Sequence, residues 1–196
     1  MLTLEALGDA LDLKDAENEG HSKRVTAFTI AIARAMRLEG DQIRIIARGA
    51  FLHDIGNMTV PDAILRKPGP LTPDEIAVMR DHCLRGYRMI KRIPFLVDAS
   101  EIVYSHHEFF DGSGYPRRLK GKEIPLGARI FAVADTLDAI TSNRQYRAAQ
   151  PLGVALDTIR EGAGTQFDPD VARVFLEMPN NIWEELGRRI EEGPFS

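Results

Sequence analysis

The chain has 196 residues, a formal net charge of -4, 28% charged residues and 44% hydrophobic residues. This is the composition of an ordinary soluble globular protein, and it lacks the basic excess typical of proteins that bind polymeric DNA or RNA. The single cysteine, Cys83, excludes an intrachain disulfide and gives no indication of a thiolate zinc site. We therefore expect an intracellular, cytoplasmic protein. The first 19 residues resemble no secretory signal, and no apolar run is long enough to cross a membrane.

The apolar pattern predicts an all-α fold with one main domain. Leucines at near-helical spacing predict an N-terminal helix or linker over residues 1–14, followed by a domain over residues 15–196. Apolar residues that recur every three or four positions predict the helices of that domain. These helices are His21 to Leu38, Asp41 to Ile55, Thr72 to Ile90, Val97 to Glu108, Pro125 to Ser142, Leu152 to Arg160, Pro169 to Leu176 and Asn181 to Arg189.

Two local signals set boundaries within this pattern. Thr72, Pro73 and Glu75 form a capping box with proline at the first helical position, which predicts a helix start. Gly56 follows the apolar helix of residues 41–55 and is expected to end it directly after His53 and Asp54.

His53 and Asp54 stand at the end of a strongly apolar run, where unpaired polar groups would cost several kcal/mol. A partner is therefore required. The pair alone fits either a core histidine hydrogen-bonded to its neighbours or a metal ligand. Asp135 and Asp138, three residues apart on one face of another apolar helix, need partners as well.

All five histidines fall at or within predicted helices beside apolar segments, and this joint placement favours metal binding over isolated core histidines. Together with the carboxylates of Asp54 and Asp135, the histidines make seven candidate ligands: His21, His53, Asp54, His82, His106, His107 and Asp135. Imidazole and carboxylate suit iron, manganese, zinc and related ions. Seven ligands exceed the roughly four to six that one ion holds, so we expect two ions with Asp54 as their bridge. Two adjacent ions are the apparatus of phosphoester hydrolysis, in which they hold a bridging hydroxide as nucleophile.

The order of these residues resembles the HD-GYP family of the HD phosphohydrolases. The tripeptide Gly114-Tyr115-Pro116, which follows the segment that begins with His106 and His107, matches the one that names the family. Similar segments continue at residues 64–71, 120–135 and 164–169, so the resemblance covers residues 15–176.

The resemblance implies an HD-domain helical bundle with a multi-metal site in its core. It implies a phosphodiesterase that hydrolyses cyclic di-GMP to pGpG, and on to GMP in some members, with two or three divalent ions, most often iron or manganese. The seven residues above would bind the metals, and Asp54 would position the hydroxide. Glu17, four residues before His21, matches a possible ligand of a third ion, although it fits a solvated acid in an acidic linker equally well.

The resemblance also assigns substrate contacts. Arg144 and Arg147 match arginines that hold substrate phosphate, which suits the forked guanidinium group. Gly114 and Tyr115 would shape the pocket, and Asp138 would anchor the site or its arginines.

One departure from the family pattern concerns the residue after His53-Asp54-Ile55-Gly56. Most members have lysine there, whereas this chain has Asn57, which brings no positive charge toward the substrate phosphate. A catalytically weak sensor that binds cyclic di-GMP or a partner protein is therefore one alternative, and a hydrolase of another cyclic dinucleotide is the other. The resemblance leaves a homodimer or a regulatory partner protein open.

Overall fold

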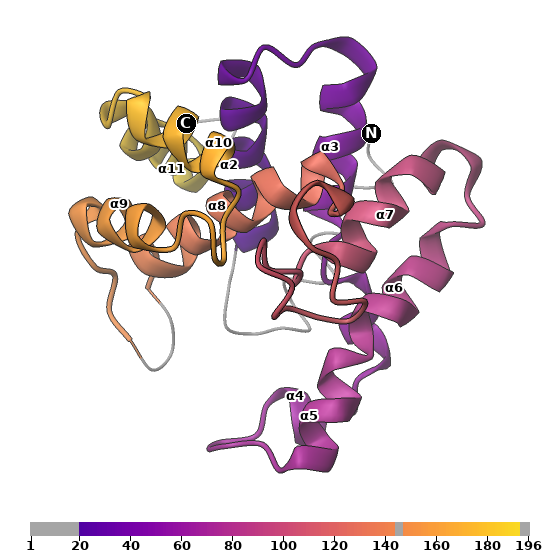
Figure 1. The fold of residues 1–196 in the computed structure, drawn as a ribbon. Helices are drawn as coiled ribbons and strands as arrows, with labels where there is room; N and C mark the ends of the chain where they lie inside the picture. Colours follow the sequence, from indigo (N-terminus) through magenta and orange to yellow (C-terminus); the bar gives the residue numbers. More distant parts are fainter. Residues whose placement is uncertain (1–19, 144–146, 193–196) are drawn as a thin grey trace.

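The computed structural model describes residues 20–143 and 147–192, and within these ranges the regular secondary structure is entirely helical (Figure 1). The predicted N-terminal helix of residues 1–14 lies outside the described residues. The helices are α2 (His21–Ala35), α3 (Gly40–Phe51), α4 (Asp62–Leu65), α5 (Pro73–Arg80), α6 (His82–Ile90), α7 (Val97–Ser105), α8 (Leu126–Thr141), α9 (Leu152–Glu161), α10 (Pro169–Glu177) and α11 (Asn181–Glu192), with short 3-10 turns η1 (Ile55–Thr59), η2 (Pro94–Leu96) and η3 (Gly121–Glu123).

Two hydrophobic clusters organise these helices. The larger cluster surrounds α8, whose Phe131, Val133 and Leu137 are almost completely buried, and it joins α2, α3, α9, α10 and α11. The smaller cluster joins the end of α3, η1, α6 and α7 through Leu52, Ile55 and neighbouring residues. In Figure 1, α8 crosses the centre of the molecule, α6 and α7 lie on one side, and α9 to α11 lie on the other. The all-α prediction is confirmed.

Several predicted boundaries were wrong in an informative way. The helix expected over residues 41–55 ends at Phe51, so His53 and Asp54 lie in the turn that follows α3. The helix expected from Thr72 to Ile90 is divided at Asp81 into α5 and α6, so that His82 begins a helix and does not lie in the middle of one. The capping box at Thr72 is confirmed: its hydroxyl accepts from the Glu75 backbone, and the Glu75 carboxylate accepts from the Thr72 backbone.

Gly56 serves a different purpose from the one expected. A Cβ atom at this position would lie 1.9 Å from the carbonyl oxygen of His82 and 2.9 Å from the backbone nitrogen of Gly86. Since atoms cannot approach so closely, only glycine lets η1 pack directly against α6. This contact brings the turn with His53 and Asp54 against the start of α6.

Candidate metal centre

Asp54 lies at the centre of a group of histidines contributed by three different segments. Its Oδ2 atom lies 3.1 Å from Nε2 of His53, which comes from the same turn. Its Oδ1 atom lies 3.4 Å from Nε2 of His82 on α6 and 3.7 Å from Nε2 of His106 at the end of α7. The two oxygens of one carboxylate thus face different imidazoles. A carboxylate placed in this way could hold a cation through either oxygen.

Three of the histidines share one backbone arrangement. Each follows the end of a helix, where carbonyl groups lack helical partners, and each donates its Nδ1–H to the carbonyl three residues earlier. The bonds are His53 to Ala50 (2.9 Å), His82 to Met79 (2.7 Å) and His106 to Val103 (2.8 Å). A carbonyl oxygen only accepts, so Nδ1 carries the proton and the Nε2 lone pair is left for a cation. The hydrogen bond from His82 also occupies the carbonyl of Met79, which would accept a backbone hydrogen bond if α5 continued past Arg80.

The separations within the group favour a cation over direct hydrogen bonds. Nε2 of His82 lies 3.2 Å from Nε2 of His106, so two nitrogen lone pairs face each other. The approaches of 3.4 and 3.7 Å to Asp54 are long for a hydrogen bond. Imidazole and carboxylate donors of this kind suit divalent transition metals, so the residues present fit the metals that the fold implies.

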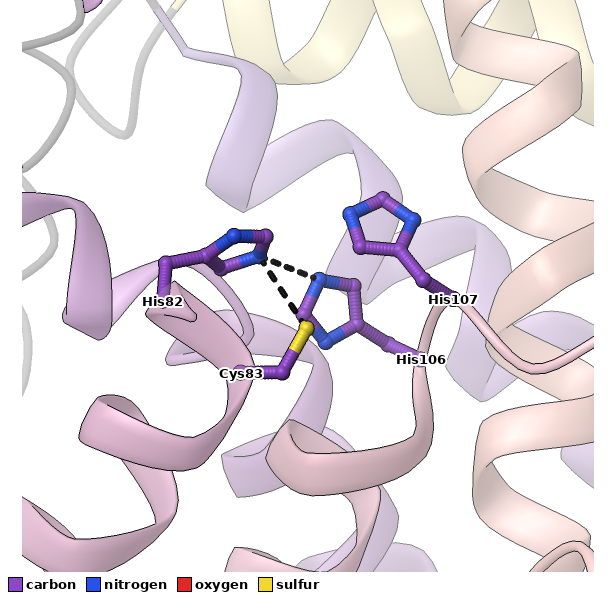
Figure 2. A group of neighbouring side chains, drawn as sticks. All are labelled: His82, Cys83, His106 and His107. Carbon is purple, nitrogen blue, oxygen red and sulfur yellow. Dashed lines mark hydrogen bonds between the residues drawn. The ribbon is translucent and has the colours of Figure 1, made fainter. Parts of the chain in front are cut away.

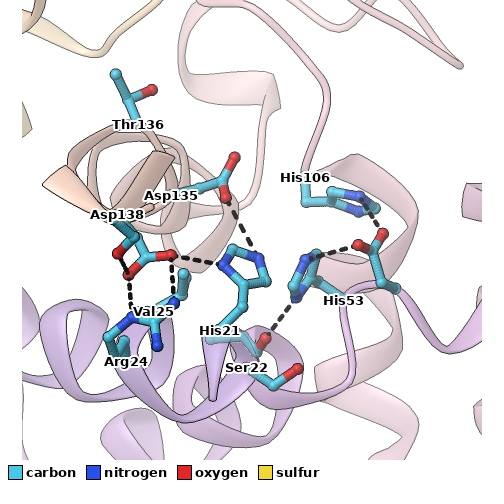
Figure 3. Close-up of polar contacts among 12 residues, drawn as sticks. His21, Ser22, Arg24, Val25, His53, His106, Asp135, Thr136 and Asp138 are labelled. Atoms are coloured by element: carbon cyan, nitrogen blue, oxygen red, sulfur yellow. Dashed lines mark hydrogen bonds and ion pairs between the residues drawn. The ribbon is translucent and has the colours of Figure 1, made fainter. Parts of the chain in front are cut away.

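His21 and Asp135 form the opposite side of the centre. Nε2 of His21 lies 3.7 Å from Oδ1 of Asp135, and its ring centroid lies 5.3 Å from that of His53. Its Nδ1 donates to Oδ2 of Asp138 at 2.7 Å, and Nε of Arg24 donates to the other oxygen of Asp138 at 2.6 Å. Figure 3 shows His21 between Asp135 and Asp138, with Arg24 below Asp138 in this view. Asp138 therefore orients His21 and leaves its Nε2 directed toward Asp135.

The charges in the centre follow from burial and from these pairs. Burial disfavours a charge on His53, but the Asp54 carboxylate outweighs it and raises the pKa of His53 to about 9. Burial would raise the pKa of Asp54, yet His53 and the neighbouring imidazoles hold it well below its usual range. Burial lowers the pKa of His82 and, together with His106, that of His107. A bound cation would take the place of the proton that His53 shares with Asp54.

His107 links the centre to the Gly114-Tyr115-Pro116 loop. Its ring centroid lies 4.1 Å from that of His106 and 4.7 Å from that of Tyr115, which stacks on it at an interplanar angle of 27°. The guanidinium carbon of Arg80, at the end of α5, lies 4.8 Å from the centroid of Tyr115. Arg80 is exposed and makes no ion pair with the described residues. His107, Tyr115 and Arg80 thus form a continuous stack from the centre to the surface.

Gly114 allows the loop to return to the histidines. A Cβ atom there would lie 2.3 Å from the backbone nitrogen of Phe109 and 2.5 Å from the carbonyl oxygen of His107. Glycine is therefore required at this position because the backbone of the neighbouring residues approaches so closely. Gly112 differs, because its positive φ of 87° itself favours glycine. Glu108, which the sequence analysis missed, is almost completely buried and accepts backbone bonds from Arg117 (2.7 Å) and Leu119 (3.1 Å). Its position directly after the two histidines was the available signal in the sequence.

The structure describes two of the remaining residues that were predicted to contact substrate, Asn57 and Arg147. Asn57 is buried, and its side-chain oxygen has no hydrogen-bond partner within the described part of the chain. Arg147 is exposed and donates to the carbonyl of Ala139 on α8. Glu17 and Arg144 lie outside the described residues. Their assignments, like the other site roles, stay predictions.

The single cysteine, to which the sequence analysis assigned no part in metal binding, lies beside the centre. Cys83, the second residue of α6, is completely buried, and its Sγ lies 3.4 Å from Nε2 of His82. One donor atom from each of four residues, His82, Cys83, His106 and His107, lies within 4.8 Å of the others (Figure 2). This group can hold a metal ion, so the single cysteine belongs to the donor-rich part of the molecule.

No helix among residues 20–143 and 147–192 has the length and apolar character needed to span a bilayer.

Comparison with known proteins places this arrangement in a family. The model of the family described as HD domain matches residues 5–171. A cyclic di-GMP phosphodiesterase of Thermotoga maritima is 39% identical over 191 residues, which are 96% of this chain and 52% of that protein. A 3'3'-cGAMP-specific phosphodiesterase of Vibrio cholerae is 37% identical over 180 residues, which are 92% of this chain and 39% of that protein. The chain thus spans about half or less of the length of these relatives.

Solved structures agree on the fold. A crystal structure of a cyclic GMP-AMP specific phosphodiesterase of Vibrio cholerae matches 94% of this chain and 52% of that chain with a TM-score of 0.71 and 18% sequence identity. A structure described as an HDG"Y"P protein of Bdellovibrio bacteriovorus matches 80% of this chain and 50% of that chain with a TM-score of 0.64 and 18% sequence identity. Since the family model spans most of the chain, the chain belongs to the HD domain family and, by its Gly114-Tyr115-Pro116 tripeptide, to the HD-GYP branch of it.

Proposed function

We propose that this chain is a metal-dependent phosphodiesterase that hydrolyses cyclic di-GMP to pGpG, with further hydrolysis to GMP left open. The observation that carries the proposal is the position of Asp54, whose two oxygens face imidazoles from different segments. The names of relatives such as the Thermotoga maritima protein support the substrate class. A substrate that serves as an internal messenger agrees with the cytoplasmic location expected from the sequence.

The proposed ligands are those named from the sequence: His21, His53, Asp54, His82, His106, His107 and Asp135. They would hold two divalent ions, iron or manganese, with Asp54 between them, and Glu17 would serve a third. Such ions activate water as a nucleophile and offset the charge of the phosphate that is attacked. Asp54 is the residue we propose as catalytic, because it positions the reacting groups.

The chain's own residues would orient the centre and the substrate. The backbone bonds to Nδ1 of His53, His82 and His106 fix the ring orientations in advance, so little reorganisation is needed when ligands bind. Arg80 holds its guanidinium face on Tyr115 and keeps its N–H groups for a substrate phosphate or guanine edge. We infer that Arg80 supplies positive charge that Asn57 does not, alongside Arg144 and Arg147.

A second cyclic dinucleotide is the main competing substrate. Relatives with comparable identity are named as specific for 3'3'-cGAMP, so specificity within the class has to be measured directly. The complete set of candidate ligands favours an enzyme over the weak sensor considered from Asn57. Control by a homodimer or by a regulatory partner protein stays a prediction.

The deciding experiment offers the metal-loaded chain equal concentrations of cyclic di-GMP and 3'3'-cGAMP and separates the products by chromatography. We expect linear pGpG to form first. Faster cleavage of 3'3'-cGAMP would change the substrate and keep the reaction class. Tight binding of cyclic di-GMP without any linear product would contradict the proposed activity and support the sensor.

A further inference from the structure

We infer that Cys83 is a sulfur ligand of the metal centre, which gives this chain a soft donor beside the imidazoles and carboxylates already described. The inference rests on the proposed metal centre and adds a residue and a metal preference to it.

Three heteroatoms surround Nε2 of His82 at short and similar distances. They are Nε2 of His106 at 3.2 Å, Sγ of Cys83 at 3.4 Å and Oδ1 of Asp54 at 3.4 Å. Because Nδ1 of His82 already donates to Met79, Nε2 offers a single lone pair. One lone pair cannot satisfy three such neighbours by hydrogen bonds. A cation bound by Nε2 of His82, Nε2 of His106 and Sγ of Cys83 would satisfy these three donors, which belong to a group of residues whose donor atoms lie within 4.8 Å of one another.

The separations agree with those between ligands of one tetrahedral ion. Nitrogens bound at about 2.0–2.1 Å are ~3.3–3.4 Å apart, and a nitrogen and a sulfur bound at about 2.3 Å are ~3.5–3.6 Å apart. The structure has 3.2 Å between the two nitrogens and 3.4 Å between nitrogen and sulfur. In Figure 2 the side chain of Cys83 points toward His82 and His106. The dashed lines from His82 reach Cys83 and His106.

The location of the sulfur leaves it few other roles. Cys83 is completely buried, so it cannot pair with a thiol of another molecule without unfolding α6, and the chain has no second cysteine. When the metal–sulfur bond forms, the thiol proton leaves for solvent, and no oxidant or reductant is needed. A thiolate donor favours zinc, iron and cobalt over manganese.

Cobalt(II) spectroscopy tests the inference directly, because Cys83 is the only cysteine of the chain. The chain is stripped of metal, loaded with Co²⁺ without oxygen, and compared with Cys83→Ser and Cys83→Ala. We expect an intense near-ultraviolet thiolate-to-cobalt charge-transfer band that both substitutions abolish, while the weaker visible d–d bands of the other ligands remain. Ser100→Ala, which removes a buried hydroxyl on the neighbouring helix α7, is the matched control and should keep the band.

A competition measurement gives a second readout independent of turnover. Cys83→Ser should lower the ratio of zinc affinity to manganese affinity by roughly tenfold, and Ser100→Ala should leave this ratio unchanged. A cobalt-loaded chain with d–d bands and no charge-transfer band would overturn the sulfur ligand and leave the proposed function intact. A chain that binds no cobalt at all would overturn both the sulfur ligand and the proposed metal centre.

Discussion

Gly56 and His82 touch through their backbones so closely that a single added carbon would have to lie 1.9 Å from the His82 carbonyl oxygen. The turn that carries His53 and Asp54 and the helix that begins with His82 are therefore held together by the absence of a side chain. The geometry of the centre depends on this backbone contact as much as on the ligands themselves.

We expect Gly56→Ala to push η1 away from α6 and to lower both stability and metal affinity. Forcing extra atoms into a packed site costs about 1–3 kcal/mol, and the carbonyl at this position belongs to rigid backbone. Chemical denaturation and metal titration measure the two effects. Gly153→Ala on α9 is the control: nothing lies within 4 Å of its added carbon, so it should stabilise the chain slightly. Equal behaviour of the two variants would contradict the role given to Gly56.

The second prediction concerns acid stability and Asp138. Burial opposes the ionisation of this carboxyl, but hydrogen bonds from His21 and Arg24 prevail and lower its pKa to about 2. Because the pKa is lower in the folded state, the ionised carboxylate stabilises the fold at pH values above the ordinary pKa near 4. This contribution disappears as the pH falls from about 4 to about 2. Its size is on the order of 2 kcal/mol.

Unfolding of the metal-free chain at a series of pH values checks this prediction. Asp138→Asn should be less stable than the parent at neutral pH, and the difference should narrow below pH ~4. Asp157→Asn removes an exposed carboxylate paired with Arg160 and should change stability little. A constant difference between parent and Asp138→Asn down to pH ~2 would show that this carboxyl is not the group responsible.

Arg80 should affect substrate binding more than the chemical step. We expect Arg80→Ala to raise the KM for cyclic di-GMP roughly tenfold, because a charge-assisted hydrogen bond contributes about 1.5–3 kcal/mol, while kcat changes little. Arg85→Ala provides the control, since Arg85 is an exposed arginine one turn away that pairs with Asp81. An unchanged KM in Arg80→Ala would remove Arg80 from the substrate site.

Asn57→Lys tests whether missing charge limits turnover. The substitution introduces the lysine that the resemblance to the HD-GYP family leads us to expect at this position. We predict a higher kcat/KM for cyclic di-GMP, because the lysine brings a positive charge near the phosphate. Steady-state kinetics of the variant and the parent measure it. An unchanged kcat/KM would show that the proposed arginines, Arg80, Arg144 and Arg147, already supply the positive charge that the lysine would add.

The sequence was sufficient to predict the fold class and the grouping of the histidines, because both depend on periodicity and residue type. It was insufficient for their orientation. Whether Nδ1 or Nε2 of His53 faces the centre depends on where α3 ends. Leu52, the residue after that end, packs in one cluster with Ile90 of α6 and Val103 of α7, which are distant in sequence. The division at Asp81 escaped prediction for a similar reason, since the bond from His82 to Met79 competes locally with a helix that propensity alone would continue.

Cys83 and Glu108 could not be assigned to the site from the sequence for the same reason. A single cysteine in an apolar helix carries no spacing signal, and only the packing of α6 against the end of α7 brings its sulfur toward His82 and His106. Glu108 looked like an ordinary acid because its partners, the backbone groups of Arg117 and Leu119, lie in a loop whose path the sequence does not specify.

The central claim is a metal centre that hydrolyses a cyclic dinucleotide, and elemental analysis combined with turnover on the same anaerobic sample tests it most directly. The parent chain should contain about two to three iron or manganese ions and should cleave cyclic di-GMP. The double variant His53→Ala, Asp54→Ala should lose both the metal and the cleavage while its circular dichroism stays helical. Full metal content or undiminished cleavage in that folded variant would contradict the account.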